Sequence, residues 1–200
     1  MKRRKAMKHF LSLTLLLALL ASFFGCSSST KGLQTASEGD IPIPIWYKNP
    51  PKAEDYLYAA YKADSKDMQI AVDKALLGAR KEIGLQIEFR MNALQQRVDE
   101  EVGIGKDAQL LQLFTQASEI VVSTSISGSR IKEQEIFKVG DSYYAFVLVE
   151  YPIGAANQAF LEQLKRSEQL YTRLRSSQIL KELNEKAEKY EKEKQEQWNK

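Results

Sequence analysis

Histidine and cysteine are almost absent from this chain of 200 residues, which has one of each, His9 and Cys26. If residues 1–25 are removed as a leader, no histidine remains. That excludes Ser-His-Asp and Cys-His catalysis, zinc bound by histidine, and a histidine pH switch. A single cysteine also excludes an internal disulfide. We therefore expect no catalytic, cofactor-binding or metal-binding residues.

Proline is scarce as well, and none of the five prolines lies between Lys52 and Tyr151. This predicts about a hundred residues of regular structure without a proline break. Apolar residues make up 44% and charged residues 28% of the chain, which is typical of a globular protein. The composition excludes collagen-like, disordered and polytopic membrane proteins.

Positive charge is concentrated at the N-terminus. Residues 1–25 hold five of the 29 basic residues and no acidic one. The other 175 residues therefore have 24 basic against 26 acidic side chains, a net charge of −2. Because this part is slightly acidic and has no obvious basic face, we expect no nucleic-acid partner.

The N-terminal pattern predicts a lipoprotein signal peptide over residues 1–25. A cationic start is followed by an apolar run over residues 10–24, which is shorter than the roughly 20 residues of a membrane-spanning helix. The sequence Phe23-Phe24-Gly25-Cys26 resembles a bacterial lipobox, which implies that Cys26 is acylated and holds the protein to outer-membrane lipid. Ser27 is not the aspartate that retains such proteins at the inner membrane. The alternative is an ordinary secretory signal with an incidental cysteine.

Residues 26–40 are rich in Ser, Thr and Gly, and we expect a flexible tether with a mean reach of about 20 Å. The next segment, residues 41–51, alternates isoleucine and proline around Trp46, and we expect it to lie extended across the domain surface.

Hydrophobic periodicity predicts the order strand, helix, helix, strand, strand for residues 41–156. The expected elements are a strand at 56–61, helices at about 66–101 and 107–120, and strands at 130–139 and 143–151. Asp64 or Ser65 is the expected cap of the first helix, and Asp107 that of the second. Ala71, Ala75, Gly78 and Ala79 would let the first helix approach a sheet closely. The predicted fold is α+β, with a small, mostly antiparallel three-stranded sheet and two helices on one face.

Residues 157–200 predict a long, charged, amphipathic C-terminal helix whose apolar stripe changes phase near Ser176 and Ser177. Two alternatives remain open. The helix either folds back on the domain or protrudes and pairs with another copy as a coiled coil.

Three short motifs are similar to known chemical sites but lack the spacing or the surroundings that those sites require. Gly103-x-Gly105-Lys106 lacks the spacing of a phosphate-binding loop, and Asp99-Glu100-Glu101 lacks that of a calcium loop. Ser127-Gly128-Ser129 has no nucleophile elbow around it. We expect a helix end at the acidic run and cross-strand packing for the strand tyrosines Tyr56, Tyr58, Tyr143, Tyr144 and Tyr151.

The pattern of packing residues resembles the Lpp-twenty-like bacterial outer-membrane lipoproteins, whose members include a flagellar lipoprotein. The resemblance spans about residues 44–151. It rests on Trp46 with Asn49-Pro50-Pro51, on Tyr56-Leu57-Tyr58-Ala59, on the small residues from Ser65 to Arg80, and on the run from Tyr143 to Val149. It implies a small, non-enzymatic envelope domain that self-associates or docks to other envelope proteins.

We therefore expect a lipid-anchored cell-envelope lipoprotein at the outer membrane, with its domain in the periplasm, acting in assembly or protein–protein interaction. One alternative is a ring or disc component of the flagellar motor, which would tie the protein to motility. A periplasmic ligand-binding module that uses the tyrosine-lined sheet is another, and a carboxylate-based enzyme is a third.

Overall fold

The computed structural model describes residues 34–35 and 41–198, all of which lie in one compact unit, Leu33–Lys200. The predicted signal peptide and the lipidation site Cys26 lie outside the described residues, as does most of the predicted tether. The sequence boundary at residue 157 does not separate two units, because the C-terminal segment belongs to the same unit as the sheet.

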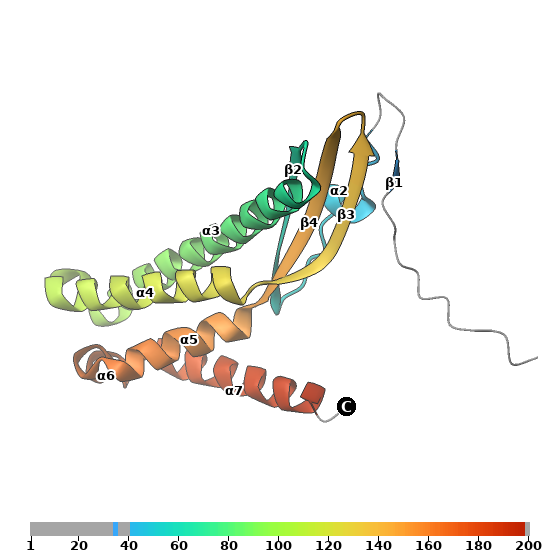
Figure 1. Ribbon diagram of the computed structural model, residues 1–200. Helices are drawn as coiled ribbons and strands as arrows, with labels where there is room; N and C mark the ends of the chain where they lie inside the picture. Colours follow the sequence, from blue (N-terminus) through green and yellow to red (C-terminus); the bar gives the residue numbers. More distant parts are fainter. Residues whose placement is uncertain (1–33, 36–40, 199–200) are drawn as a thin grey trace, which may run out of the picture. The chain divides into compact units, whose positions relative to one another are not determined.

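The sheet has the strand order β1-β3-β4-β2. Three long strands, β2 (Tyr56–Ser65), β3 (Arg130–Val139) and β4 (Ser142–Pro152), pair antiparallel, and Gly140 (φ 56°) provides the turn between β3 and β4. The two-residue strand β1 (Gln34–Thr35) lies within the predicted tether and runs parallel to β3. The α+β class and the β-α-α-β-β order are confirmed (Figure 1).

Helix α3 (Met68–Val102) covers one face of this sheet. Ala71, Ala75 and Ala79 are fully buried there, so the predicted close approach of a small-residue face is confirmed. At Gly78 the approach is closest, because a Cβ atom at this position would overlap the ring of Tyr61. The predicted cap was wrong: β2 continues through Ser65, and the cap is Asp67, whose carboxylate accepts the Ile70 N–H at 3.0 Å.

Helix α4 (Ala108–Gly128) follows a short 3₁₀ turn, η2 (Ile104–Lys106), and Asp107 caps it as predicted. It runs eight residues beyond the predicted end at Ile120. The Ser- and Thr-rich stretch stays helical because its hydroxyls bond to carbonyls of the preceding turn; Ser125, for example, donates to the Val122 carbonyl at 2.7 Å. Helix α4 packs along the second half of α3, and both helices lie to the same side of the sheet (Figure 1).

The opposite face of the sheet is covered by the segment that precedes β2. This segment includes the single-turn helix α2 (Ile45–Lys48), where the sequence predicted only extended chain. The Tyr47 ring packs edge-on against Phe146 at 5.0 Å, and Phe146 in turn packs against Phe137. The Trp46 indole N–H donates to Glu135 at 2.9 Å. The predicted course across the domain surface is therefore confirmed, and it closes a second, smaller core.

The C-terminal segment forms three helices, α5 (Ile153–Arg166), α6 (Glu168–Leu174) and α7 (Gln178–Trp198). The long, amphipathic C-terminal helix of the prediction is α7 alone. The break before it falls at residues 175–177, where the apolar stripe changes phase. Ser177 caps α7 by accepting the Leu180 N–H at 3.1 Å.

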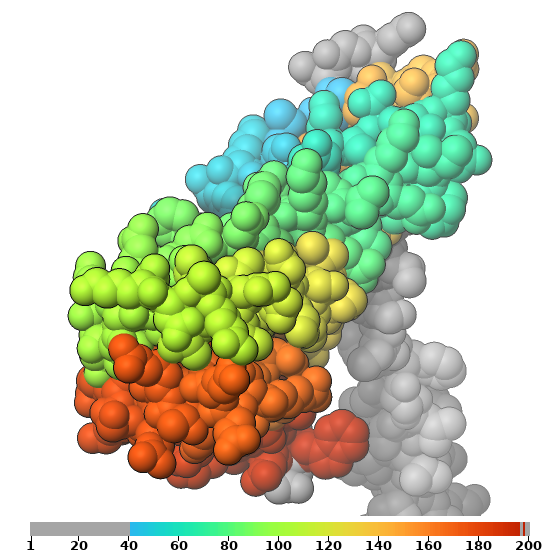
Figure 2. Space-filling view, turned by 90° about the vertical axis from the view of Figure 1, so that its left-hand side faces the viewer, coloured from blue at the N-terminus to red at the C-terminus, as the bar shows by residue number. Residues whose placement is uncertain are grey.

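Helix α7 folds back along α5, so the folded-back alternative is the one that the structure adopts. Its apolar stripe is buried in that contact; Leu180, Leu183 and Ala187 are no more than 6% exposed. Helices α5 and α6 in turn pack against α4, and Figure 2 shows the two layers in contact.

Candidate functional site

The loop after α3 is a helix terminus in the structure. Gly103 adopts the left-handed conformation (φ 69°) that ends α3, and the Asp99 carboxylate accepts the Gly105 N–H at 2.6 Å. The backbone N–H groups of Gly103 and Gly105 therefore bond within the chain, to the carbonyl and the carboxylate of Asp99. In the motif Ser127-Gly128-Ser129, the Ser129 hydroxyl donates to the Ile126 carbonyl at 2.9 Å, where α4 ends.

Glu101 has a role that the sequence did not reveal. Its carboxylate accepts the backbone N–H groups of Gln178 at 2.6 Å and Ile179 at 3.4 Å, the first two residues of α7. Reciprocally, the Arg173 guanidinium donates to the Val102 carbonyl at the end of α3, from Nε at 2.9 Å and also from Nη2. Each helix end is thus capped by a side chain of opposite charge to its dipole, and α3 is joined to the C-terminal helices.

The main concavity of the described residues is a groove between the second half of α3 and α7, with a volume of about 1520 Å³. Its lining comes from several places in the chain: residues 85–97 of α3, residues 179–198 of α7, the start of α5, the end of α4 with the start of β3, and the adjoining ends of β2 and β4. Sequence periodicity could not predict this groove, because its lining residues come from segments that lie far apart in the chain.

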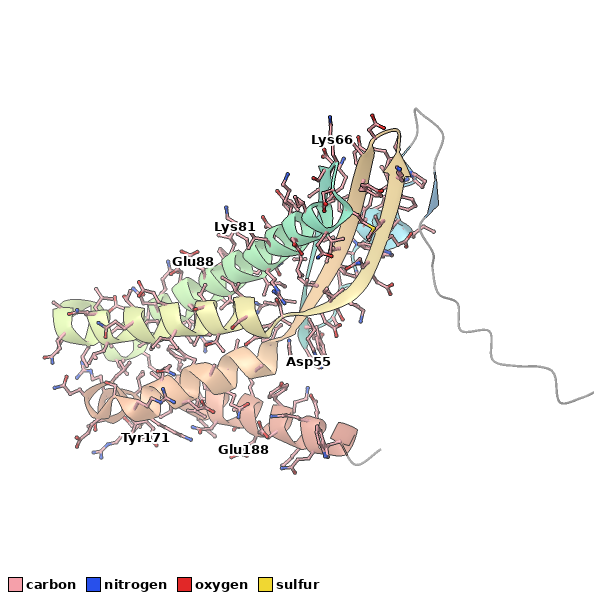
Figure 3. All side chains as sticks on the ribbon, in the orientation of Figure 1. Asp55, Lys66, Lys81, Glu88, Tyr171 and Glu188 are labelled. Carbon is pink, nitrogen blue, oxygen red and sulfur yellow. The ribbon has the colours of Figure 1, made fainter. Side chains whose placement is uncertain are left out.

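An ion pair bridges α3 and α7 within the groove lining. Arg97 donates to Glu182 at 2.9 Å, and this hydrogen bond holds the pKa of the Glu182 carboxyl below its usual value. A second bridge joins Lys189 of α7 to Asp55 at 3.4 Å, and the Asp55 charge raises the pKa of the Lys189 ammonium. Figure 3 shows Asp55 at the foot of β2, where its carbonyl accepts the Ile153 N–H that begins α5. Both bridges are largely exposed, so each contributes little to stability.

The inner wall of the groove includes Tyr151, which is 3% exposed. Burial, with a smaller contribution from Tyr190, raises the pKa of its phenol to about 12. Next to it α5 and α7 touch at Gly154, where a Cβ atom would lie only 2.5 Å from the Cβ of Tyr190. The wall is therefore closely packed.

The rim of the groove carries large apolar side chains in solvent. Phe89 is 76% exposed, Trp198 is 89% exposed, and Leu85 is about half exposed. The groove lining also includes the cations Arg90, Arg130 and Lys186. None of these forms a salt bridge with a described residue, although, beside the Arg97 hydrogen bond, the Lys186 charge contributes to lowering the pKa of Glu182. Exposed aromatic side chains beside arginines are typical of protein interfaces.

The strand tyrosines divide between the two surfaces of the sheet: Tyr151 and Tyr143 pack on the core that α3 covers, whereas Tyr56, Tyr58 and Tyr144 lie on the opposite surface. Tyr56 stacks on Tyr58 with ring centroids 6.2 Å apart, and the Lys132 ammonium lies over the Tyr58 ring at 5.3 Å. Lys132 also pairs with Glu150 at 2.9 Å, and this bond raises the pKa of the lysine. The tyrosine stack is therefore within one strand, and the cross-strand contacts are made with lysines, as where the Lys62 ammonium of β2 lies over the Tyr144 ring of β4 at 5.4 Å.

Within residues 34–35 and 41–198, no group of three or more His, Cys, Asp or Glu side chains is placed to hold a metal ion. In the same part of the chain, no helix combines the length and the apolarity needed to cross a membrane. Comparison with known proteins found no matching family model, no matching curated protein and no matching solved structure.

Proposed function

We propose that this protein is a non-enzymatic, lipid-anchored lipoprotein of the outer membrane that acts by docking to another envelope protein. The observation that carries the docking role is the groove between α3 and α7, with Phe89 and Trp198 exposed at its rim. Apolar side chains that gather in solvent beside a groove often mark an interaction site, and aromatic anchors are enriched among the residues that contribute most to binding in protein interfaces. The lipobox-like sequence at Cys26 supports the anchor.

The anchor is tested by metabolic labelling with radioactive palmitate. The native chain should incorporate label, and Cys26→Ser should abolish incorporation because the thiol that carries the lipid is gone. Label that persists unchanged in Cys26→Ser refutes the lipoprotein assignment and leaves an ordinary secretory signal.

The docking role is tested by a photo-crosslinking amino acid placed at position 89 in living cells. We expect a discrete covalent adduct with an envelope protein, identified by mass spectrometry. Lys81, which lies on α3 two turns before Phe89 and outside the groove lining, is the matched control position and should give no adduct. Equal adducts at both positions, or none at either, would refute docking through this groove.

A periplasmic ligand-binding module is the second candidate function, because a groove of this kind could also hold a small molecule. Pockets for small molecules usually have volumes of about 300–1,000 Å³. The volume of about 1520 Å³ exceeds that range, which favours a macromolecular segment. Native mass spectrometry of the purified chain separates the two, because a ligand-binding module should carry a reproducible added mass of a few hundred daltons.

A further inference from the structure

We infer that the occupant of the groove is an acidic amphipathic helix from a partner protein. This inference rests on the docking role proposed above and specifies what docks. It draws on the size of the groove, its charge and the absence of a suitable free helix elsewhere in the described residues.

The size of the groove fits a short helix. An α-helix with side chains is about 10 Å across and rises 1.5 Å per residue, so each residue fills about 120 Å³. The volume of about 1520 Å³ therefore holds about 13 residues, between three and four turns. The walls are two helices, and an amphipathic helix laid into a groove between helices is a common mode of peptide recognition.

The apolar and charged residues of the groove define the chemistry of the occupant. Leu85 and Phe89 lie one turn apart on α3 and offer an apolar strip to the groove. Six basic residues and four acidic residues line it, and the cations without a salt bridge to a described residue are Arg90, Arg130 and Lys186. A helix with an apolar stripe flanked by Asp and Glu would bury its stripe on Phe89 and pair its carboxylates with these cations.

A second copy of this chain does not supply that helix from its described residues. The apolar stripes of α4, α5 and α7 are already buried within the unit, including Phe114 of α4, Phe160 of α5 and Leu183 of α7. Presenting any of them would require the unit to open. Helix α3 exposes Leu77, Leu85 and Phe89, but in a second copy this strip would bring Arg90 toward the same cations. We therefore assign the occupant to a segment of a different protein.

The test uses the full chain held in nanodiscs of neutral phosphatidylcholine. The probe is a fluorescein-labelled 14-residue helical peptide with a leucine stripe and glutamate flanks, and its control has lysine in place of every glutamate. Fluorescence anisotropy should show saturable binding of the acidic peptide, at least about tenfold tighter than the basic one, and weakening as salt rises. Equal affinity for the two peptides overturns the inference.

Variants place the binding in the groove. Phe89→Ala and the double variant Arg90→Glu, Lys186→Glu should each weaken binding about tenfold or more. Lys81→Glu, on α3 outside the groove lining, should change it less than about twofold. Circular dichroism must show unchanged helix content in each variant. Unchanged binding by the groove variants overturns the inference.

A lipid occupant is a distinguishable outcome. If nanodiscs or vesicles with anionic phosphatidylglycerol compete for the peptide, and Phe89→Ala removes that competition, the groove is a lipid site and the inference is wrong. If crosslinking at position 89 captures a protein while the acidic and basic peptides bind alike, the docking role stands and only the chemistry assigned to the partner fails.

Discussion

Gly154 is the position where one added methyl group should test the contact between α5 and α7. In Gly154→Ala the new Cβ would lie 2.5 Å from the Tyr190 Cβ, 2.6 Å from its Cγ and 2.7 Å from its Cδ2. Nonbonded carbons prefer about 3.5–4.0 Å, so the gap must widen by about 1 Å. Since the Cβ of Tyr190 is fixed to the backbone of α7, a change of rotamer cannot relieve the overlap and the helix itself must move.

We expect Gly154→Ala to lower the free energy of unfolding by about 1–3 kcal/mol, the usual cost of overpacking. For a unit of this size, that corresponds to a fall in Tm of about 2–12 °C, measured by thermal circular dichroism. Urea titration at 25 °C measures the change in the free energy of unfolding without heating the protein. In the peptide assay, the variant should bind more weakly than the native chain, because α7 carries one wall of the groove.

Gly84→Ala is the matched control. Gly84 is also buried in a helix contact, but the nearest atoms to its added Cβ are Cδ1 and Cγ1 of Ile126, both at 2.9 Å. These belong to a side chain that can change rotamer. In addition, alanine gains about 1 kcal/mol of helix propensity over glycine in a helix interior. We expect Gly84→Ala to lie within about 1 kcal/mol of the native chain.

The variant Tyr190→Ala tests whether the backbone of α7 or the ring of Tyr190 obstructs the added methyl group. It removes the ring but keeps the Cβ, so it should not restore the stability of Gly154→Ala in the double variant. If the double variant regains the stability of Tyr190→Ala alone, the ring was the obstacle and the reasoning about backbone proximity is wrong. A Gly154→Ala variant as stable as the native chain would refute it more directly.

Three further predictions follow from the described contacts. Glu101→Gln should lower the free energy of unfolding by about 1–2 kcal/mol in urea titrations, because it discharges the cap of α7, whereas the neighbouring Glu100→Gln should change it by less than about 0.5 kcal/mol. Tyr151 has a folded-state pKa of about 12, above its unfolded value near 10, so its stabilisation is complete below pH 10 and is lost as the pH rises through 12. Between pH 9 and pH 11.5 this loss amounts to at most about 1.8 kcal/mol in urea titrations, and Tyr151→Phe should remove it. An equal loss in both chains would contradict the prediction. Phe160→Ala should cost about 3–5 kcal/mol by thermal unfolding, since this fully buried ring packs against Phe114 at 5.1 Å; a cost below 1 kcal/mol would mean that the contact is not formed.

Local and periodic features of the fold could be predicted from the sequence. The small-residue face of α3 and the order of strands and helices along the chain follow from spacing, and the phase change near Ser176 indicated the turn before α7. The end of α4 was missed because Ser125 and its neighbours resemble a loop in composition, while their hydroxyls satisfy carbonyls of their own helix. Local sequence does not distinguish these two uses of serine.

The groove could not be predicted, for a different reason. Phe89 occupies a position that fits an amphipathic helix in sequence, and only the arrangement of α3 and α7 leaves it in solvent. Glu101 likewise acts on residues 77 positions away. Contacts of this range depend on how the helices pack, and the apolar pattern of one segment does not contain that information.

The length of α3 has a consequence for where this protein can be shortened. The 35 residues of α3 extend about 52 Å. Its buried residues begin at the strands, near Ala75, and continue to the part that packs on other helices, near Met91 and Val98. A chain that stops at residue 156, the end of the domain by sequence patterning, keeps the strands but removes the helices that pack on α4 and, to a lesser extent, on α3. It would expose apolar surface and aggregate. Residues 153–198 therefore have to be retained in any soluble fragment. If deleting them impairs function in cells, the first explanation to test is misfolding of the remaining chain, ahead of the loss of a binding partner.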